Sequence, residues 1–379
     1  MNSRTSRLRP PRRRGFALAF TLLSITVLGA LAGGLFFMTL RESRDARDAL
    51  HRVRALSAAE FGVYTVRSSV GWNPLWNATP TRGLLDSLAF EPGDASLDSV
   101  QIWKLAPSDF RVVSQGFSGT GSGRARHLVT LLLTLRAPHI NPRVAATVAG
   151  QATLSGLARV SGADSTVAGW ECPPPGPDLP ALRLADTGAM DTLACTASPC
   201  VSGTPPVLAD SMAADSRTHE QFGTFTRDQI AALGITLPAS AEILDPAPSL
   251  DALSRCDLAD PVNLGDPLRT LGTNSPCAHV FPVRYAPASL HLSGGAGQGT
   301  LVVDGNLLMD NGARFFGVLL VRGELRLTGA ARFTGVAFAS HLTMDGDAGI
   351  QLSRCAATRA FLALGTPVQP PGLAWTDLR

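Results

Sequence analysis

Six cysteines are the residues of this 379-residue chain whose chemistry is easiest to assign. They are Cys172, Cys195, Cys200, Cys256, Cys277 and Cys355. An even number of cysteines in an oxidising compartment predicts disulfide bonds, although spacing alone does not separate the possible pairings. Cys195 and Cys200 have the spacing of a metal knuckle, but no second close Cys or His pair completes a set of four ligands. We therefore predict disulfides, and no metal or other cofactor.

The acidic residues near the C-terminal end do not form a hydrolytic pattern. Within an 18-residue repeat described below, they fall at different positions and so do not stack on one face: Asp304, Asp310, Glu324, Asp345 and Asp347. The glycine run at 294–299 lacks the Lys-Ser/Thr of a phosphate loop, and residues 345–347 lack the repeated units of calcium-binding coils. No G-x-S-x-G or H-E-x-x-H element occurs. These observations predict a protein that is not an enzyme.

An internal repeat organises the C-terminal part of the chain. Residues 148–162 align without a gap with residues 321–335, and a third copy begins at Val303, 18 residues before Val321. A degenerate fourth copy follows at 339–350. Short alternating strands separated by glycines in an 18-residue unit predict coils of a right-handed β-solenoid. The arginines of the repeat, Arg159, Arg314 and Arg332, are expected to point outward as a ladder, either as a solvated face or as a site for an acidic glycan.

A Cys/Pro-rich segment, 164–290, separates the first copy from the others and holds five of the six cysteines. We expect a disulfide-pinned insertion with little regular structure, except for a helix at about 226–233 that the Thr-Arg-Asp-Gln start indicates. Cys355, after the last coil, is a candidate to tie the end of the solenoid to this insertion.

The N-terminus carries the positive charge of the protein. The net charge of the chain is +3, and six arginines in the first fourteen residues contribute +6, so the remainder carries −3: Arg4, Arg7, Arg9, Arg12, Arg13 and Arg14. Nucleic-acid binding needs basic residues on a folded face, so we interpret this leader as a topology signal and predict no nucleic-acid partner.

A long apolar segment follows the basic leader. The 26 residues from Gly15 to Leu40 carry no charge, and as a helix they reach about 39 Å, more than the ~30 Å of a bilayer core. The arginines before the segment predict a cytoplasmic N-terminus, an inner-membrane span and an exported body. Gly29 and Gly33 either form a small-xxx-small helix contact or are incidental. Helical apolar spacing continues to about Val70, with residues such as Leu50, Val53 and Tyr64 expected to lie on a globular domain.

The segment RGFALAF at 14–20 resembles the class III leader of type IV pilins and pseudopilins. The segment RALSAAE at 54–60, with Ala58, Ala59 and Glu60, is similar to the signature of PilX-type minor pilins. The resemblance implies cleavage by a prepilin peptidase between Gly15 and Phe16, methylation of the new N-terminus, and assembly with other pilin subunits through the helix.

One residue departs from the pilin pattern. Major pilins carry a glutamate five residues into the mature chain, where it neutralises the amine of an adjacent subunit, and this chain has Phe20 there. An unpaired buried ammonium is costly, which favours a minor, priming or tip subunit. Two other leaders compete: an A-x-A signal-peptidase site at 30–32 and a twin-arginine motif at 13–18.

The expected fold class is α+β: a long N-terminal membrane helix, a small antiparallel sheet, and a right-handed β-solenoid with a Cys/Pro-rich insertion. Strands are predicted at 100–105, 110–114 and 127–136. The predicted divisions are a leader 1–15, a pilin-like helix 16–70, a strand-rich domain 71–145, a first coil 146–163, the insertion 164–290, further coils 291–355, and a tail 356–379.

These observations predict a minor pilin or pseudopilin-like component of a type IV pilus or related secretion filament, exposed on the pilus or cell surface. The alternatives are a single-pass membrane-anchored solenoid that binds envelope glycan, and a secreted β-helix carbohydrate enzyme.

Overall fold

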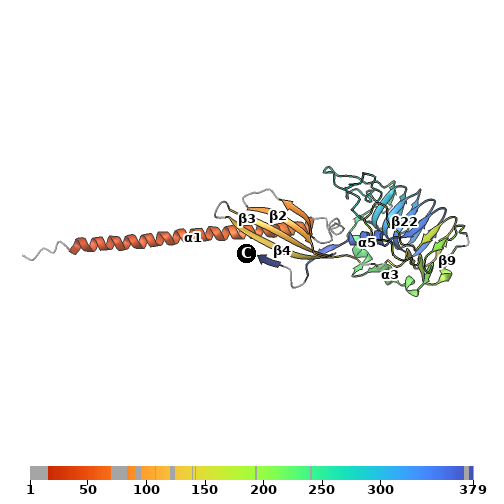
Figure 1. The fold of residues 1–379 in the computed structure, drawn as a ribbon, viewed down its shortest axis with the longest axis horizontal. Helices are drawn as coiled ribbons and strands as arrows, with labels where there is room; N and C mark the ends of the chain where they lie inside the picture. The colour runs from red at the N-terminus through yellow and green to blue at the C-terminus, as the bar shows by residue number, and fades with distance from the viewer. Residues whose placement is uncertain are drawn as a thin grey trace, which may run out of the picture.

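The computed structural model describes residues 16–379 except 70–82, 90–94, 107, 120–123, 139, 141, 193, 240, 371–374 and 379. A long helix, α1 (Phe16–Ser69), runs into a small antiparallel sheet, and a larger β-rich head lies beyond that sheet (Figure 1). The prediction of an α+β protein with a long N-terminal helix and a small antiparallel sheet is therefore confirmed.

Helix α1 has two halves with different surroundings. Residues 16–50 are exposed almost throughout, whereas Ala55, Ala59, Val63 and Val66 are buried against the sheet. Their spacing of three and four residues places them on one face of the helix. The predicted packing face was partly wrong: Leu50, Val53 and Tyr64 are exposed, because a face of small residues lets the helix approach the sheet more closely.

The small sheet consists of β1 (Gly83–Ala89), β2 (Ala95–Lys104), β3 (Asp109–Ser118) and β4 (Ala125–Arg136), all antiparallel. Burial alternates along β3, because α1 packs across β2, β3 and β4 and covers one face. The three predicted strands correspond to β2, β3 and β4. Strand β1 was not predicted, and neither were β25 (Thr366–Val368) and β26 (Trp375–Leu378), which return from the C-terminal end to pair with β4.

The repeats of the head stack in parallel. One sheet contains β18 (Ala296–Val303), β20 (Arg314–Val321) and β22 (Arg332–Ala339), and the other contains β19 (Leu307–Asp310), β21 (Glu324–Leu327) and β23 (His341–Met344). Between β20 and β22 each residue pairs with the one 18 positions later, as Arg314 does with Arg332. The repeat read from the sequence is thus the unit that adds one strand to each sheet.

The copy of the repeat that comes first in the chain stacks against the copy that comes last. Its strands β5 (Ala146–Val148), β6 (Ala152–Leu154) and β7 (Arg159–Ser161) pair with β22, β23 and β24 (Gly349–Leu352), respectively. The chain therefore enters the stack at one end, leaves through the segment 164–290, and returns at the other end.

The segment 164–290 contains more regular structure than expected. Beyond the first copy it adds β8 (Leu182–Leu184), β9 (Met190–Asp191), β10 (Val201–Ser202) and β11 (Val207–Ala209). At the opposite end lie β14 (Ile235–Thr236), β15 (Ala241–Leu244) and β16 (Val283–Ala286), and β17 (Leu290–Ser293) follows them. Strands of two to four residues are too short for an alternating pattern to be recognised in the sequence.

Short α-helices in the described part of the head are α3 (Ser216–Glu220), α4 (Arg227–Ala232) and α5 (Arg354–Leu362). Helix α4 has the predicted capping box, in which Thr226 and Gln229 exchange hydrogen bonds with each other's backbone N–H. Helix α5 packs against β18, β20 and β22.

The head has one continuous apolar core. Phe315 and Phe333 stack in it with ring centroids 6.4 Å apart and an interplanar angle of 16°. Gly317 and Gly335, paired across β20 and β22, have φ values of 136° and 151°, a backbone region that a side chain disfavours. A Cβ at Gly335 would overlap the carbonyl of Gly317, so these strands stack closely only with glycine at this position.

Candidate functional site

Helix α1 is long and apolar enough to cross a membrane. The candidate span covers Phe16–Arg67, with a mean hydropathy of 2.1 in its most apolar window, none of which is buried inside the protein. Phe16, on one side of the predicted cleavage point, is 78% exposed, and Gly15 lies outside the described residues. The lower half of α1 is thus free to contact lipid or other helices.

The predicted signature residues lie where α1 meets the sheet. Ala59 is buried, Ala58 is half-buried and Glu60 is exposed. A Cβ added at Gly116 of β3 would lie 2.6 Å from the backbone nitrogen of Ala59 and would overlap the carbonyl oxygen of Ala55. The small residues on the helix and the glycine on the strand together allow this close contact, and Gly116 was not singled out from the sequence.

The opposite face of the upper half of α1 carries exposed apolar side chains. Leu50, Val53 and Phe61 are 48%, 61% and 60% exposed, respectively. Their spacing places them on the side of the helix that faces away from the sheet. Because this apolar face continues the exposed lower half of α1, it extends the surface available to a neighbouring helix.

All six predicted cysteines form disulfides. Cys172 pairs with Cys355, Cys195 with Cys200, and Cys256 with Cys277. The first bond joins residues 183 positions apart and links the segment 164–290 to α5, as expected for Cys355. The other two close short loops within that segment, which has few long elements of its own.

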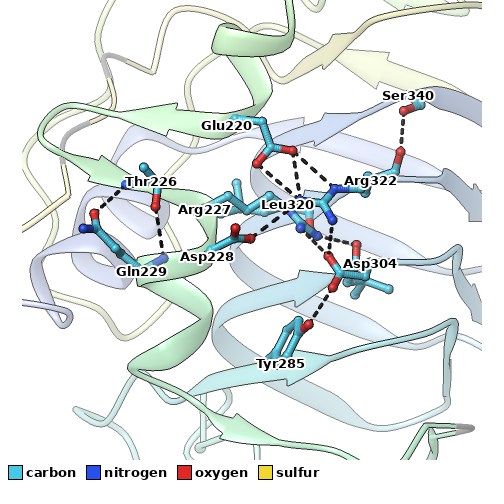
Figure 2. Close-up of polar contacts among 11 residues, drawn as sticks. Glu220, Thr226, Arg227, Asp228, Gln229, Tyr285, Asp304, Leu320, Arg322 and Ser340 are labelled. Atoms are coloured by element: carbon cyan, nitrogen blue, oxygen red, sulfur yellow. Dashed lines mark hydrogen bonds and ion pairs between the residues drawn. The ribbon is translucent and has the colours of Figure 1, made fainter.

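A cluster of charged residues connects α4 to the repeats (Figure 2). The side chain of Arg227, at the start of α4, is 2% exposed. It forms an ion pair with Asp304 and donates hydrogen bonds to the carbonyl oxygens of Val303, at 2.6 Å, and Leu320, at 3.3 Å. The capping box that begins α4 therefore places Arg227 over the ends of β18 and β20.

Asp304 is the acceptor at the centre of this cluster. Besides Arg227, it accepts a hydrogen bond from the Tyr285 hydroxyl at 2.5 Å and pairs with Arg322 at 3.2 Å. Burial alone would raise the pKa of Asp304, but the hydrogen bonds from Tyr285 and Arg227, with the two guanidinium charges, lower it. The same hydrogen bond raises the pKa of Tyr285.

Arg322 completes the network by pairing with Glu220 at 3.2 Å and with Asp228 at 3.6 Å. Two arginines and three carboxylates give a net charge of 2 − 3 = −1, and each of them has a partner of opposite sign within the cluster. A carboxylate held ionised and fully paired is poorly suited to general acid or base catalysis. We interpret this cluster as the contact that holds α3 and α4 on the head.

The arginines of the repeat lie in one row across the sheet. Arg314 pairs with Arg332, Arg332 with Gly349, and Gly349 with Arg159. The expected ladder is therefore interrupted at Gly349. Arg332 forms an ion pair with Asp347 at 2.7 Å, whereas Arg159 is exposed.

The acidic residues and histidines do not gather around a common point. Within the part of the chain that the structure describes, no group of three or more His, Cys, Asp or Glu side chains is placed to hold a metal ion.

The fold is thus a long exposed helix whose upper half packs on an antiparallel sheet, followed by a head of stacked parallel repeats. No family model matches the chain, and no curated protein matches it. A solved structure to which it is similar is the crystal structure of the competence-associated pilin ComZ from Thermus thermophilus. The identity is 11% and the TM-score is 0.23, with 87% of this chain and 97% of that chain covered.

Proposed function

We propose that this chain is a minor pilin or pseudopilin-like subunit of a type IV pilus or related secretion filament. The observation that carries the proposal is the division of α1: an exposed apolar half long enough to span a membrane continues without a break into a half that packs on a small antiparallel sheet. A single rigid helix of this kind both anchors the subunit and presents a surface to neighbouring helices.

The exposed apolar face of the upper half of α1 supports assembly rather than anchoring alone. Leu50, Val53 and Phe61 lie C-terminal to the 26-residue uncharged segment, so a lipid anchor does not require them to be apolar. A neighbouring pilin-like helix packed along α1 would bury them together with the lower half.

The sequence before α1 supports a cytoplasmic N-terminus in the inner membrane and an exported head. In this proposal a prepilin peptidase cuts between Gly15 and Phe16, and the lipid bilayer holds α1 until assembly. Phe20, which replaces the carboxylate of major subunits, supports a priming or tip position, where no subunit above requires its charge.

The head serves display rather than catalysis in this proposal, and its stacked repeats form a right-handed β-solenoid. The parallel pairing of residues 18 positions apart between β20 and β22 supports the solenoid, because one repeat then corresponds to one coil. The fully paired charges around Asp304 support a structural role for that cluster.

Intact mass and N-terminal sequencing of the protein from its native membrane test the proposal. We expect a mature chain that begins at methylated Phe16, and a Gly15→Leu variant that retains its leader. An intact Met1 would contradict the proposal, and so would a start at Gly33 after cleavage by signal peptidase.

A further inference from the structure

A groove crosses the outer face of the parallel sheet at the interruption in the arginine row. Its volume is about 370 Å³, within the range of ligand sites, and its walls come from β22, β24, β7 and the loop that holds Pro199. Gly349 lies between Arg332 and Arg159, and the side chain of Arg332 extends over it, because a Cβ added at Gly349 would lie 2.9 Å from Arg332 Cδ. The side chains of Arg332 and Arg159 both line the groove.

The two arginines are placed to hold anions along one line. They are two strands apart, or about 10 Å between backbones, on the same row of the same face. Arg159 is exposed and makes no ion pair with any described residue. Arg332 forms an ion pair with Asp347, which also lines the groove, and donates a hydrogen bond to the Ala331 carbonyl at 3.4 Å. Side-chain exposures of 42% and 58% make the ion pair weak and exchangeable.

A second row of polar side chains runs beside the arginines. Thr334 pairs with Gln351, Gln351 with Ser161, and Ser161 with Ser202, so hydroxyl and amide groups repeat at every strand. All four are half-buried and line the groove. Hydroxyl and amide groups both donate and accept hydrogen bonds, which suits them to the hydroxyl groups of sugars.

We propose that this groove binds an acidic polysaccharide, with the carboxylates of successive uronic acid residues held by Arg159 and Arg332. A guanidinium binds a carboxylate through two parallel hydrogen bonds, and the polar row contacts the sugar hydroxyls. Phe333 is buried and the groove presents no exposed aromatic ring among its described lining residues, so it offers no surface for stacking nucleic-acid bases.

The position of the groove fits a polymer outside the cell. Strand β7 belongs to the same repeat as β6, which pairs with β9, and β9 lies at the end of the head farthest from α1 (Figure 1). A polysaccharide therefore reaches this end of the protein without approaching the membrane. The inference does not depend on whether the subunit assembles into a filament.

Binding of oligogalacturonate to the full-length protein in detergent tests the proposal. The methyl ester of oligogalacturonate is the control for a sugar without charge, and inorganic polyphosphate is the control for an anion without sugar. We expect oligogalacturonate to bind best. Arg159→Gln and Arg332→Gln should each weaken it roughly tenfold, the loss expected for a charge-assisted contact. Gly349→Thr, whose side chain would displace that of Arg332 from its place over Gly349, should weaken binding as well.

Arg314→Gln is the matched control, because Arg314 lies in the same row but outside the groove. The affinity of this variant for oligogalacturonate should equal that of the parent. Thermal unfolding should show that all four variants are folded. An equal loss of affinity in Arg314→Gln would show that general surface charge causes the effect, and would overturn the proposal. Absence of binding, equal binding of the methyl ester, or preferred binding of polyphosphate would overturn it too.

Discussion

Arg227 is a charged residue whose burial depends on its polar neighbours. At 2% side-chain exposure it has lost almost all contact with water. An ion pair with Asp304 and hydrogen bonds to two backbone carbonyl groups replace that contact. Removing Arg227 would leave the two buried carbonyl groups without this donor, whereas Asp304 would keep Tyr285 and Arg322 as partners. The stability of the contact between α4 and the repeats thus rests on a few polar groups.

We expect Arg227→Ala to lower the free energy of unfolding by about 1–3 kcal/mol, because Asp304 and the carbonyl groups of Val303 and Leu320 lose a hydrogen-bond donor. Arg255→Ala is the control: Arg255 also pairs with an aspartate, Asp251, but is 71% exposed, and its loss should cost about 0–1 kcal/mol. Urea unfolding of both variants measures the difference. Equal losses would contradict the role assigned to Arg227.

Asp164 links the start of the segment 164–290 to α5. Its side chain is 7% exposed and accepts hydrogen bonds from the backbone of Arg354 and Gly176 and from the Arg354 guanidinium, each at 2.9 Å. Burial alone would raise the pKa of Asp164, but these hydrogen bonds and the Arg354 charge lower it. The ionised form therefore stabilises the fold.

This lowered pKa predicts an acid-dependent loss of stability. The contribution is fully present above the unfolded pKa of about 3.9 and is lost as the pH falls through the lower folded pKa. Asp164→Asn should therefore reduce the urea midpoint at about pH 7, and this difference should shrink as the pH falls through the folded pKa. A difference between variant and parent that does not change as the pH falls would contradict this assignment. Asp228→Asn is the control, because the side chain of Asp228 is 81% exposed.

At the scale of elements, the contact between α1 and β3 depends on residues that lack bulk. Ala55 and Ala59 are fully buried, and Gly116 faces them from the sheet. Close approach of a helix to a sheet increases the dispersion contacts between their backbones. This packing explains why the exposed face of α1, rather than the buried one, carries the larger apolar side chains.

Gly116→Val should destabilise the sheet domain by about 1–3 kcal/mol, because the new side chain would overlap backbone atoms of Ala55 and Ala59. Valine is favoured in strands, so a loss would come from the contact and not from strand propensity. Glu60→Ala, on the exposed face of α1, should stay within about 0.5 kcal/mol of the parent. Thermal unfolding followed by circular dichroism distinguishes the two.

The molecule as a whole separates a helical stalk from the folded part. Among the residues that the structure describes, the hydrogen bond between His51 Nδ1 and Ser118 Oγ, at 3.0 Å, ties α1 to the sheet. Residues 16–50, which precede it, are exposed almost throughout. The stalk is therefore available for the membrane and for other subunits without any change in the rest of the protein.

We expect a chain that begins at Arg47 to leave the membrane fraction and to unfold within about 0.5 kcal/mol of the full-length protein in detergent, because few buried contacts are removed. Cell fractionation and urea unfolding measure the two effects. A large loss of stability would mean that the lower half of α1 supports the sheet, and retention in the membrane would point to a second membrane contact.

The sequence alone determined the features that local patterns encode. Apolar composition predicted α1 to within one residue of its observed end at Ser69, and the recurring glycines and arginines predicted the 18-residue repeat. The capping box at Thr226 and Gln229 predicted α4. Each of these signals lies within one element or one repeat, where hydrophobic periodicity and capping act directly on the backbone.

Only the tertiary structure decided which distant residues meet. The Cys172–Cys355 pairing, the placement of the first repeat after the last, and the contact of Gly116 with α1 join segments far apart in the chain. The row of arginines was predicted from the repeat, but its interruption at Gly349 was not. The fourth copy of the repeat is degenerate, so only the parallel pairing of β22 with β24 shows that Gly349 stands at the arginine position. Such contacts arise from packing between elements, and no single periodic pattern in the sequence records them.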